Sequence, residues 1–262
     1  MISITVITVV FNDAIGLART LQSVRKVKFF LDKSIFDFNY IVIDGGSTDD
    51  TLALISNNCD IVDHWRSEPD RGIFDAMNKG ANVAKTNSWL IWINAGDELL
   101  KDICSISSVD NDVEVIFSPV ITSQGRLLRP NILLPYNESN IFPNTKFMHQ
   151  GFLIKKESFE NLGAYSELVG LQADGYLMSL ATLYSKFTVL TKPISIFDLN
   201  GISNTRHYRV LISYFSVVRA LRMSFFLVVL NNKMYILKMI TKIILPNVVN
   251  KMLGRVIRFL IR

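Results

Sequence analysis

The sequence predicts an α/β fold built on a mostly parallel, doubly wound sheet. Three observations lead to this prediction. Over about the first 95 residues, β-branched apolar runs alternate with segments of helical spacing. The runs are apolar nearly throughout, as in strands buried on both faces. Polar residues follow each run directly, where a parallel sheet places its ligand-binding edge.

The first part of the chain alternates strand and helix regularly. Four strands are expected, at Ile4–Val10, Tyr40–Ile43, Ile61–Trp65 and Trp89–Ile93. Three helices are expected between them, over Gly16–Val24, from a cap at Ser47 or Thr48 to about Asn57, and over Ile73–Ala84. This order is typical of βαβ units.

The remaining chain is less periodic. Further strands are expected at Val113–Phe117, Phe152–Ile154 and Phe187–Leu190, with a hairpin turn at Ser123–Arg126 and a helix over about Asp174–Tyr184. From Arg206 onward the pattern is helical and is interrupted by Pro246. We therefore expect one domain over residues 1–205, with halves 1–100 and 101–205, and a helical tail over 206–262.

Composition excludes several classes of protein. The chain has 262 residues, of which 49% are hydrophobic and 19% charged, so it is neither disordered nor collagen-like. Cys59 and Cys104 do not make a disulfide scaffold, and we expect small buried side chains in a reducing compartment. No Cys/His cluster has zinc-ligand spacing, and no Walker or GxGxxG motif is present.

The net charge of the chain is +5, but the charged residues are distributed unevenly along it. Residues 201–262 hold eleven Lys or Arg and no Asp or Glu, whereas residues 1–200 hold 17 basic and 23 acidic residues. Such asymmetry points to a polyanionic surface, either a membrane or a nucleic acid. The tail lacks the aromatic–basic interleaving of a stacking platform, so we expect no nucleic-acid partner.

The last segment, residues 247–262, is predicted to form a basic amphipathic helix. Lys251, Arg255, Arg258 and Arg262 are spaced four, three and four apart and so share one face. Such a helix suits an anionic bilayer interface. The alternative is a helix packed on the main domain with its cations in water.

No secretory signal and no membrane span are expected. The start of the chain lacks a cationic segment, and the best apolar stretch, Val210–Leu230, is interrupted by Arg219 and Arg222. We therefore expect a cytoplasmic protein that lies peripherally on the inner face of the membrane.

The expected strand ends deliver acids and amides to one edge of the sheet. The residues are Asn12 and Asp13, then Asp44, then Glu68 and Asp70, and finally Asn94 and Asp97. This edge is the predicted ligand site. Asp97 follows an apolar strand in a glycine-containing turn, where a carboxylate can bind Mg²⁺ or Mn²⁺. The alternative for Asp97 is a cap of the next helix.

Six strings along the chain resemble one family. They are TVVFN (8–12), IDGGSTDD (43–50), SEPDRGIFDAMNKG (67–80), WINAGDE (92–98), HQGFLIKK (149–156) and ADGY (173–176). Together they are similar to the inverting family 2 glycosyltransferases, and most of all to the bacterial surface-polysaccharide branch. The resemblance covers about residues 2–205. It implies a GT-A fold and transfer of a sugar from a nucleotide diphosphosugar, commonly UDP-linked and metal-assisted.

The resemblance implies where the nucleotide binds. Thr8 and Asn12 match the loop after the first strand, which cradles the nucleobase in the family. Asp44 matches the acid that contacts the base or ribose, since a carboxylate accepts from the ring N–H or sugar hydroxyls. The alternative for Asp44 is an Asx turn. Gly45 departs from the second acid that many relatives have there.

A further stretch resembles the family's donor-side helix and contains Asp70, Gly72, Asp75, Asn78 and Lys79. The resemblance implies that Asp75 holds donor-sugar hydroxyls and that Lys79 offsets the charge of the diphosphate. The alternative is that Asp75 and Lys79, four residues apart, form a solvated helix pair.

Asn94–Asp97 takes the place of the family's DxD metal motif and departs from it. A strict DxD has acids two apart, whereas this string offers one acid and an amide. The resemblance implies that Asp97 is the ligand of Mn²⁺ or Mg²⁺, that Asn94 contacts ribose or a metal-bound water, and that Glu98 is a substitute ligand.

Asp174 in ADGY matches the position of the catalytic base. An inverting transfer is a single displacement, and a carboxylate must take the acceptor's proton as the bond forms. The alternative is a cap of the helix that begins there. His149 and Gln150 match a family pair near the acceptor side. Arg206, His207 and Arg209 are expected either over the leaving diphosphate or in a membrane-facing cluster.

The expected function is therefore an inverting hexosyltransferase. It would move a hexose or N-acetylhexosamine from UDP-Gal, UDP-Glc or a UDP-N-acetylhexosamine to a hydroxyl of a lipid-linked acceptor of the undecaprenyl diphosphate type. The bond would be β, and the pathway would assemble O-antigen (lipopolysaccharide) or capsule repeat units. The alternative is a non-catalytic nucleotide-sugar-binding or scaffold protein at the membrane.

Overall fold

A computed structural model describes residues 1–131, 148–199 and 216. The chain divides into two compact units, and the first holds nearly all of the described residues, namely 1–131, 148–167 and 174–199. The expected tail helix, Pro246 and the cluster of Arg206, His207 and Arg209 lie outside the described residues. No helix among the described residues is long and apolar enough to cross a membrane.

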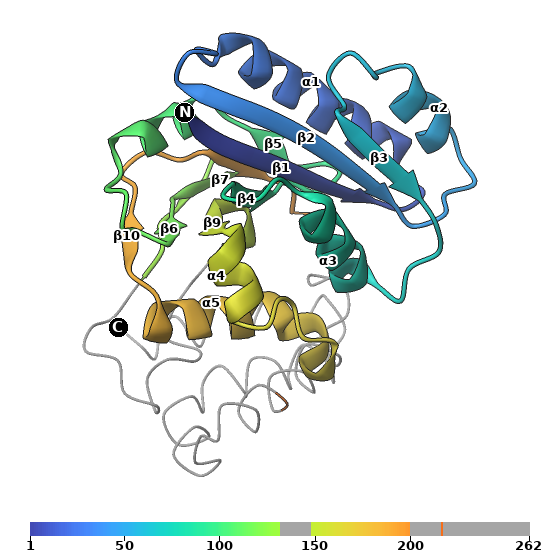
Figure 1. Ribbon diagram of the computed structural model, residues 1–262. Helices are drawn as coiled ribbons and strands as arrows, with labels where there is room; N and C mark the ends of the chain where they lie inside the picture. Colours follow the sequence, from blue (N-terminus) through green and yellow to red (C-terminus); the bar gives the residue numbers. More distant parts are fainter. Residues whose placement is uncertain (132–147, 200–215, 217–262) are drawn as a thin grey trace, which may run out of the picture. The chain divides into compact units, whose positions relative to one another are not determined.

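A seven-stranded sheet forms the centre of the first unit (Figure 1). Its strands, in spatial order, are β10 (Phe187–Val189), β6 (Val115–Phe117), β9 (Phe152–Lys155), β4 (Trp89–Trp92), β1 (Ile2–Val10), β2 (Phe36–Asp44) and β3 (His64–Ser67). All neighbouring pairs are parallel except those that involve β9, which runs antiparallel to both β4 and β6. The mostly parallel sheet predicted from the sequence is confirmed.

A second sheet of four short strands returns the chain to the end of β4. Its order is β5 (Glu98–Leu99), β11 (Ser195–Phe197), β7 (Val120–Thr122) and β8 (Leu127–Leu128). Strands β7 and β8 form the hairpin predicted at Ser123–Arg126. Because β11 pairs antiparallel with β5, the residue after β11 comes back beside the turn that follows β4.

Helices cover both faces of the large sheet (Figure 1). The α-helices are α1 (Ala14–Phe30), α2 (Thr51–Ser56), α3 (Ile73–Val83), α4 (Lys156–Asn161) and α5 (Ala173–Tyr184). The short 3₁₀ segments are η1 (Lys101–Ser108), η2 (His149–Gly151) and η3 (Glu167–Gln172).

The two faces of β1 alternate, as a strand requires. Ile4 and Val6 belong to a core cluster with Leu17 and Leu21 of α1. On the other face, α3 approaches closely, because a Cβ added at Gly80 would lie 2.5 Å from Ile7. A glycine is therefore needed at this crossing of helix and strand.

Three local predictions differ from the structure. The cap of α2 is Asp50, not Ser47 or Thr48, and it makes no side-chain cap bond. The third strand begins at His64 rather than Ile61, because residues 58–61 form turns. Thr8 lies inside β1 instead of in the loop after it, since β1 extends to Val10.

Candidate functional site

The carboxyl ends of β1, β2 and β3 meet at one edge of the large sheet. Val10 is opposite Asp44, and Asp44 is opposite Ser67. The strands are then tied together just beyond their ends, since Gly45 donates its N–H to the carbonyl of Val10 at 2.9 Å. The predicted convergence of polar residues at this edge is confirmed for these strands.

Asp44 is a fully buried hub of hydrogen bonds. Its Oδ2 accepts from the N–H groups of Gly46 and Ser47 at 3.0 and 2.9 Å and from Ser67 Oγ at 2.6 Å, and its Oδ1 accepts from Ser47 Oγ at 2.5 Å. These bonds make the Asx turn that was the alternative for this residue. Asp44 therefore shapes the loop after β2 and fixes that loop to β3.

Asn12 lies at the edge of the sheet, whereas Thr8 is buried in the core. Asn12 lies just past β1 with φ of 50°, and its Oδ1 accepts the N–H of Thr48 at 2.8 Å. Thr8 is fully buried, donates to the carbonyl of Ile93 at 2.6 Å and accepts from the Tyr40 hydroxyl at 3.0 Å. Thr8 therefore supports the strand from within the core and does not face the site.

Phe11 lies at the same edge of the sheet, although no polar group marks it in the sequence. It follows β1 directly and is 62% exposed, which is unusual for a large aromatic side chain at the end of a buried strand. A Cβ added at Gly45 would lie 3.3 Å from its ring and 2.5 Å from Asp70 Oδ2. A side chain at position 45 would therefore require the Asp70 carboxylate to move.

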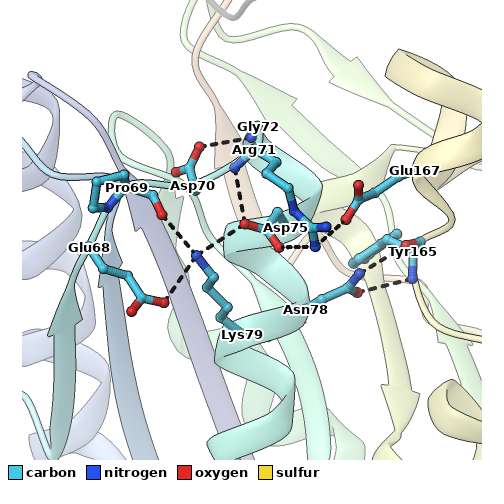
Figure 2. A network of polar contacts seen from close by, with 10 residues as sticks. All are labelled: Glu68, Pro69, Asp70, Arg71, Gly72, Asp75, Asn78, Lys79, Tyr165 and Glu167. Atoms are coloured by element: carbon cyan, nitrogen blue, oxygen red, sulfur yellow. Dashed lines mark hydrogen bonds and ion pairs between the residues drawn. The ribbon is translucent and has the colours of Figure 1, made fainter.

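Helix α3 begins with a network of ion pairs (Figure 2). Asp75 accepts from the backbone N–H and the guanidinium of Arg71, both at 3.0 Å, and from Lys79 at 3.0 Å. Arg71 also pairs with Glu167 at 2.8 Å. Lys79 reaches Glu68 at 3.0 Å and the carbonyl of Pro69 at 3.2 Å.

This network leaves Lys79 little freedom to act on a ligand. An ammonium group has three donors, and the three acceptors around Lys79 match them. The pair with Asp75 forms as the alternative interpretation expected, but it is not solvated, because the Asp75 side chain is only 11% exposed. Burial by itself raises the pKa of Asp75, yet the donors from Arg71 and Lys79 prevail and lower it to about 2.

A second set of contacts joins α3 to the residues before η3. Asn78 donates to the carbonyl of Tyr165 at 2.9 Å and accepts its N–H at 3.1 Å (Figure 2). The Tyr165 hydroxyl lies 2.8 Å from His149 Nε2, and both side chains pack against Trp92. Burial lowers the pKa of His149 to about 4, so its ring is neutral near pH 7.

Asp97 lies in a tight turn after β4 and is 3% exposed. Its Oδ1 accepts the N–H of Asp198 at 2.8 Å, and its Oδ2 accepts from Gln150 Nε2 at 3.1 Å. Burial, reinforced by the charge of Asp198, raises the pKa of Asp97 to about 7 against those hydrogen bonds. The alternative role as a helix cap is wrong, because β5 follows at Glu98 and η1 begins only at Lys101.

The side-chain oxygens around this turn are of the kind that binds a hard divalent cation. The described residues contain no group of three His, Cys, Asp or Glu that could hold a metal by itself. The Oδ1 of Asn94 is buried and accepts no hydrogen bond from the described residues. This oxygen is available to a water molecule or a ligand. One or two carboxylates with waters and substrate phosphates suffice for Mg²⁺, and the side chains of Asp97 and Asn94 both carry an oxygen that can bind it.

Asp174 is the second residue of α5 and accepts the N–H of Gly175 at 2.7 Å. Its carboxyl is in closely packed surroundings, and this burial raises its pKa to about 6 despite the hydrogen bonds from backbone N–H groups. Its negative charge adds to the burial that raises the pKa of Tyr165. The candidate base therefore lies beside the tyrosine that contacts His149.

Comparison with known proteins identifies relatives of the chain. The profile of the family described as "Glycosyl transferase family 2" matches residues 5–162. The "PGL/p-HBAD biosynthesis glycosyltransferase" of Mycobacterium bovis (strain BCG / Pasteur 1173P2) is 33% identical over 218 residues, which cover 77% of this chain and 79% of the relative.

Solved structures share the fold. S. aureus TarS 1-349, whose complex with UDP-GlcNAc is also known, has a TM-score of 0.63 and 16% identity; the match covers 84% of this chain and 64% of that one. The mannosyltransferase PcManGT from Pyrobaculum calidifontis, solved with GDP-Man and Mn²⁺, has a TM-score of 0.61 and 17% identity, with the same coverage. The chain thus spans about two thirds of these solved chains, and the predicted GT-A fold is confirmed.

Proposed function

The chain belongs to glycosyl transferase family 2, and from this premise we propose that it transfers a hexose or N-acetylhexosamine from a UDP-sugar with inversion. The observation that carries the proposal is a polar sheet edge with an exposed aromatic ring, together with a separate, partly buried carboxylate. The edge consists of Phe11, Asp44 and Asp70, and the carboxylate is Asp174.

The nucleotide would bind against the loops after β1, β2 and β3. The exposed ring of Phe11 offers a stacking surface for a base. Asn12 and Asp70 border it with polar oxygens, while Asp44 holds the loop in shape from beneath. UDP-Gal, UDP-Glc and UDP-N-acetylhexosamines are the donors we propose, and a complex of TarS with UDP-GlcNAc supports the chemistry by analogy of fold.

Asp174 would act as the general base. A carboxyl with a pKa of about 6 is ionised at neutral pH and yet basic enough to accept a proton from an attacking hydroxyl. The sugar would then be attacked at its anomeric carbon from the side opposite the diphosphate. An α-linked donor would give a β-linked product.

Mn²⁺ or Mg²⁺ would be held by Asp97, with Asn94 of the same turn and Glu98, the first residue of β5, as further oxygen ligands. When bound, the cation would offset the charge that develops on the leaving diphosphate. Gln150 would orient the Asp97 carboxylate through its 3.1 Å hydrogen bond. The Mn²⁺ in the mannosyltransferase structure supports a metal by analogy of fold.

We further propose a lipid-linked glycan of the undecaprenyl diphosphate type as acceptor, in assembly of a surface polysaccharide such as O-antigen. The cationic tail motivates this, because a lipid-anchored sugar is met at an anionic bilayer. The protein would then lie at the inner face of the cytoplasmic membrane.

A donor screen tests the function. Purified protein is incubated with radiolabelled UDP-sugars and a lipid-linked acceptor, with and without EDTA, and the product's anomeric configuration is read by NMR. We expect transfer that chelation abolishes and Mn²⁺ restores, and a configuration opposite to the donor's. Donor binding with neither transfer nor hydrolysis would favour the non-catalytic alternative, and a retained configuration would reject the single displacement.

A further inference from the structure

The turn after β4 lacks the second acid that a DxD motif supplies. In Asn94–Asp97, the acid two residues after the first motif position would stand at residue 96, which is a glycine. Gly96 has φ of +95°, in the region that favours glycine over every residue with a side chain. The backbone of this turn therefore excludes a carboxylate on residue 96 itself.

The carboxylate of a residue that follows another strand lies beside that place. A Cβ added at Gly96 would lie 3.1 Å from Oδ2 of Asp198. Asp198 follows β11, whose pairing with β5 sets Ile196 opposite Glu98. The backbone N–H of Asp198 also donates to Asp97 Oδ1 at 2.8 Å. The carboxylates of Asp97 and Asp198 thus both lie at the turn. That of Asp198 lies where a side chain on residue 96 would point.

We propose that Asp198 supplies the second carboxylate of the divalent-cation site, together with Asp97, and that Arg19 holds it when no cation is bound. This proposal rests on the proposed function, since it names a further ligand of the same site. Arg19 Nη2 lies 3.0 Å from Asp198 Oδ2. The Asp198 side chain is 13% exposed, whereas that of Arg19 is 48% exposed.

The charges around the turn favour this arrangement. Two neighbouring carboxylates repel one another unless a cation lies close to both. Arg19 compensates only from the Asp198 side, because its bond is to Asp198 and Asp97 is occupied by Gln150 and a backbone N–H. A divalent cation between Asp97 and Asp198 would replace the guanidinium as the partner of Asp198.

Direct binding of Mn²⁺ tests the proposal without any turnover. Mn²⁺ is titrated into the full chain in the presence of UDP, and free Mn²⁺ is followed by electron paramagnetic resonance. Asp198→Asn keeps the size and the backbone donor but removes the charge. The matched control is Asp60→Asn, since Asp60 also pairs with an arginine of α1, Arg25, away from the turn. We expect Asp198→Asn to weaken Mn²⁺ affinity by at least about tenfold and Asp60→Asn to leave it unchanged within about twofold.

Arg19→Gln should change the Mn²⁺ affinity in the opposite direction. If the guanidinium competes with the cation for Asp198, its removal tightens Mn²⁺ binding, while Arg25→Gln leaves it as it was. This second variant serves even if Asp198→Asn does not fold. Parent-like Mn²⁺ affinity in a folded Asp198→Asn, weaker binding in Arg19→Gln, or no Mn²⁺ binding by the parent protein overturns the proposal. Tight Mn²⁺ binding that depends on Asp198, without sugar transfer to any acceptor, would instead refute the proposed function and keep the cation site.

Discussion

Gln150 donates a 3.1 Å hydrogen bond from Nε2 to Oδ2 of Asp97, across 53 residues of sequence. The sequence motif predicts Gln150 near the acceptor side, and the structure shows its amide bonded to the turn after β4. The reason is that β9 runs antiparallel beside β4, so the segment before β9 arrives at the end of β4. Gln150 thereby helps to orient the carboxylate proposed to bind the cation.

Replacing Gln150 by Leu should weaken Mn²⁺ binding about 10- to 100-fold, because the carboxylate of Asp97 loses the donor that orients it. The measurement is Mn²⁺ titration in the presence of UDP. Gln124→Leu in the exposed β7–β8 turn is the matched control and should have no effect. An unchanged Mn²⁺ affinity in the Gln150 variant would show that Gln150 does not position the Asp97 carboxylate.

Asp44→Asn should destabilise the protein by about 2–3 kcal/mol, because the amide nitrogen would face donors where a carboxylate accepted four hydrogen bonds. Ser67→Ala removes one of those bonds and should cost about 1 kcal/mol. Urea unfolding measures both changes. UDP binding should weaken more in Asp44→Asn than in Ser67→Ala, and equal costs of the two variants in unfolding would contradict the role of Asp44 as a hub.

The rate should depend on pH through Asp174. Its pKa of about 6 means that the carboxylate is lost as the pH falls below that value, so kcat/KM should drop about tenfold per pH unit on the acid side. Asp174→Asn should lower kcat about 10²- to 10⁴-fold, leave UDP binding intact and abolish this dependence. Glu157→Gln, at the exposed start of α4, is the control. A variant at Asp174 that kept the acid limb would assign the base elsewhere.

Asp75 should contribute to stability in a defined pH window. Its folded pKa of about 2 lies below the ordinary 3.8, so the contribution is complete above pH 4 and is lost as the pH falls toward 2. Asp75→Asn should therefore cost about 2 kcal/mol at pH 7, by the size of that shift, and little near pH 2. Urea unfolding of both proteins from pH 2 to 7 gives the difference. If the loss of unfolding free energy in Asp75→Asn were independent of pH, the charge of Asp75 would not be what stabilises the fold.

The tail should bind the protein to anionic membranes. Each cation near such a surface contributes about 1 kcal/mol, and residues 232–262 hold seven of the eleven cations in the tail. The full chain should sediment with phosphatidylserine vesicles and be released by high salt, whereas a variant ending at Asn231 should sediment much less. Neutral vesicles are the control. Equal sedimentation of the two proteins, each checked for folding by circular dichroism, would refute the membrane proposal.

The sequence by itself determined the βαβ order, the parallel sheet and the edge at which the site lies. These features are local, because a buried strand is a short β-branched run and a helix repeats its apolar residues every three or four positions. The bounds of α3 and β4 were accordingly predicted to within a residue. The motifs also placed Asp44 and Asp97 at strand ends and Asp174 at the start of a helix. In the structure Asp44 is the last residue of β2, Asp97 is the last residue of the turn between β4 and β5, and Asp174 is the second residue of α5.

Only the tertiary structure decided which of these residues meet. Thr8 proved to be a core residue because the alternation of β1 turns it toward Tyr40, not toward the loop. Asp198 lies beside Gly96 because β11 pairs with β5, a strand of two residues that carries almost no sequence signal. Pairing between distant strands is set by the packing of the whole sheet, so no window of local sequence contains it.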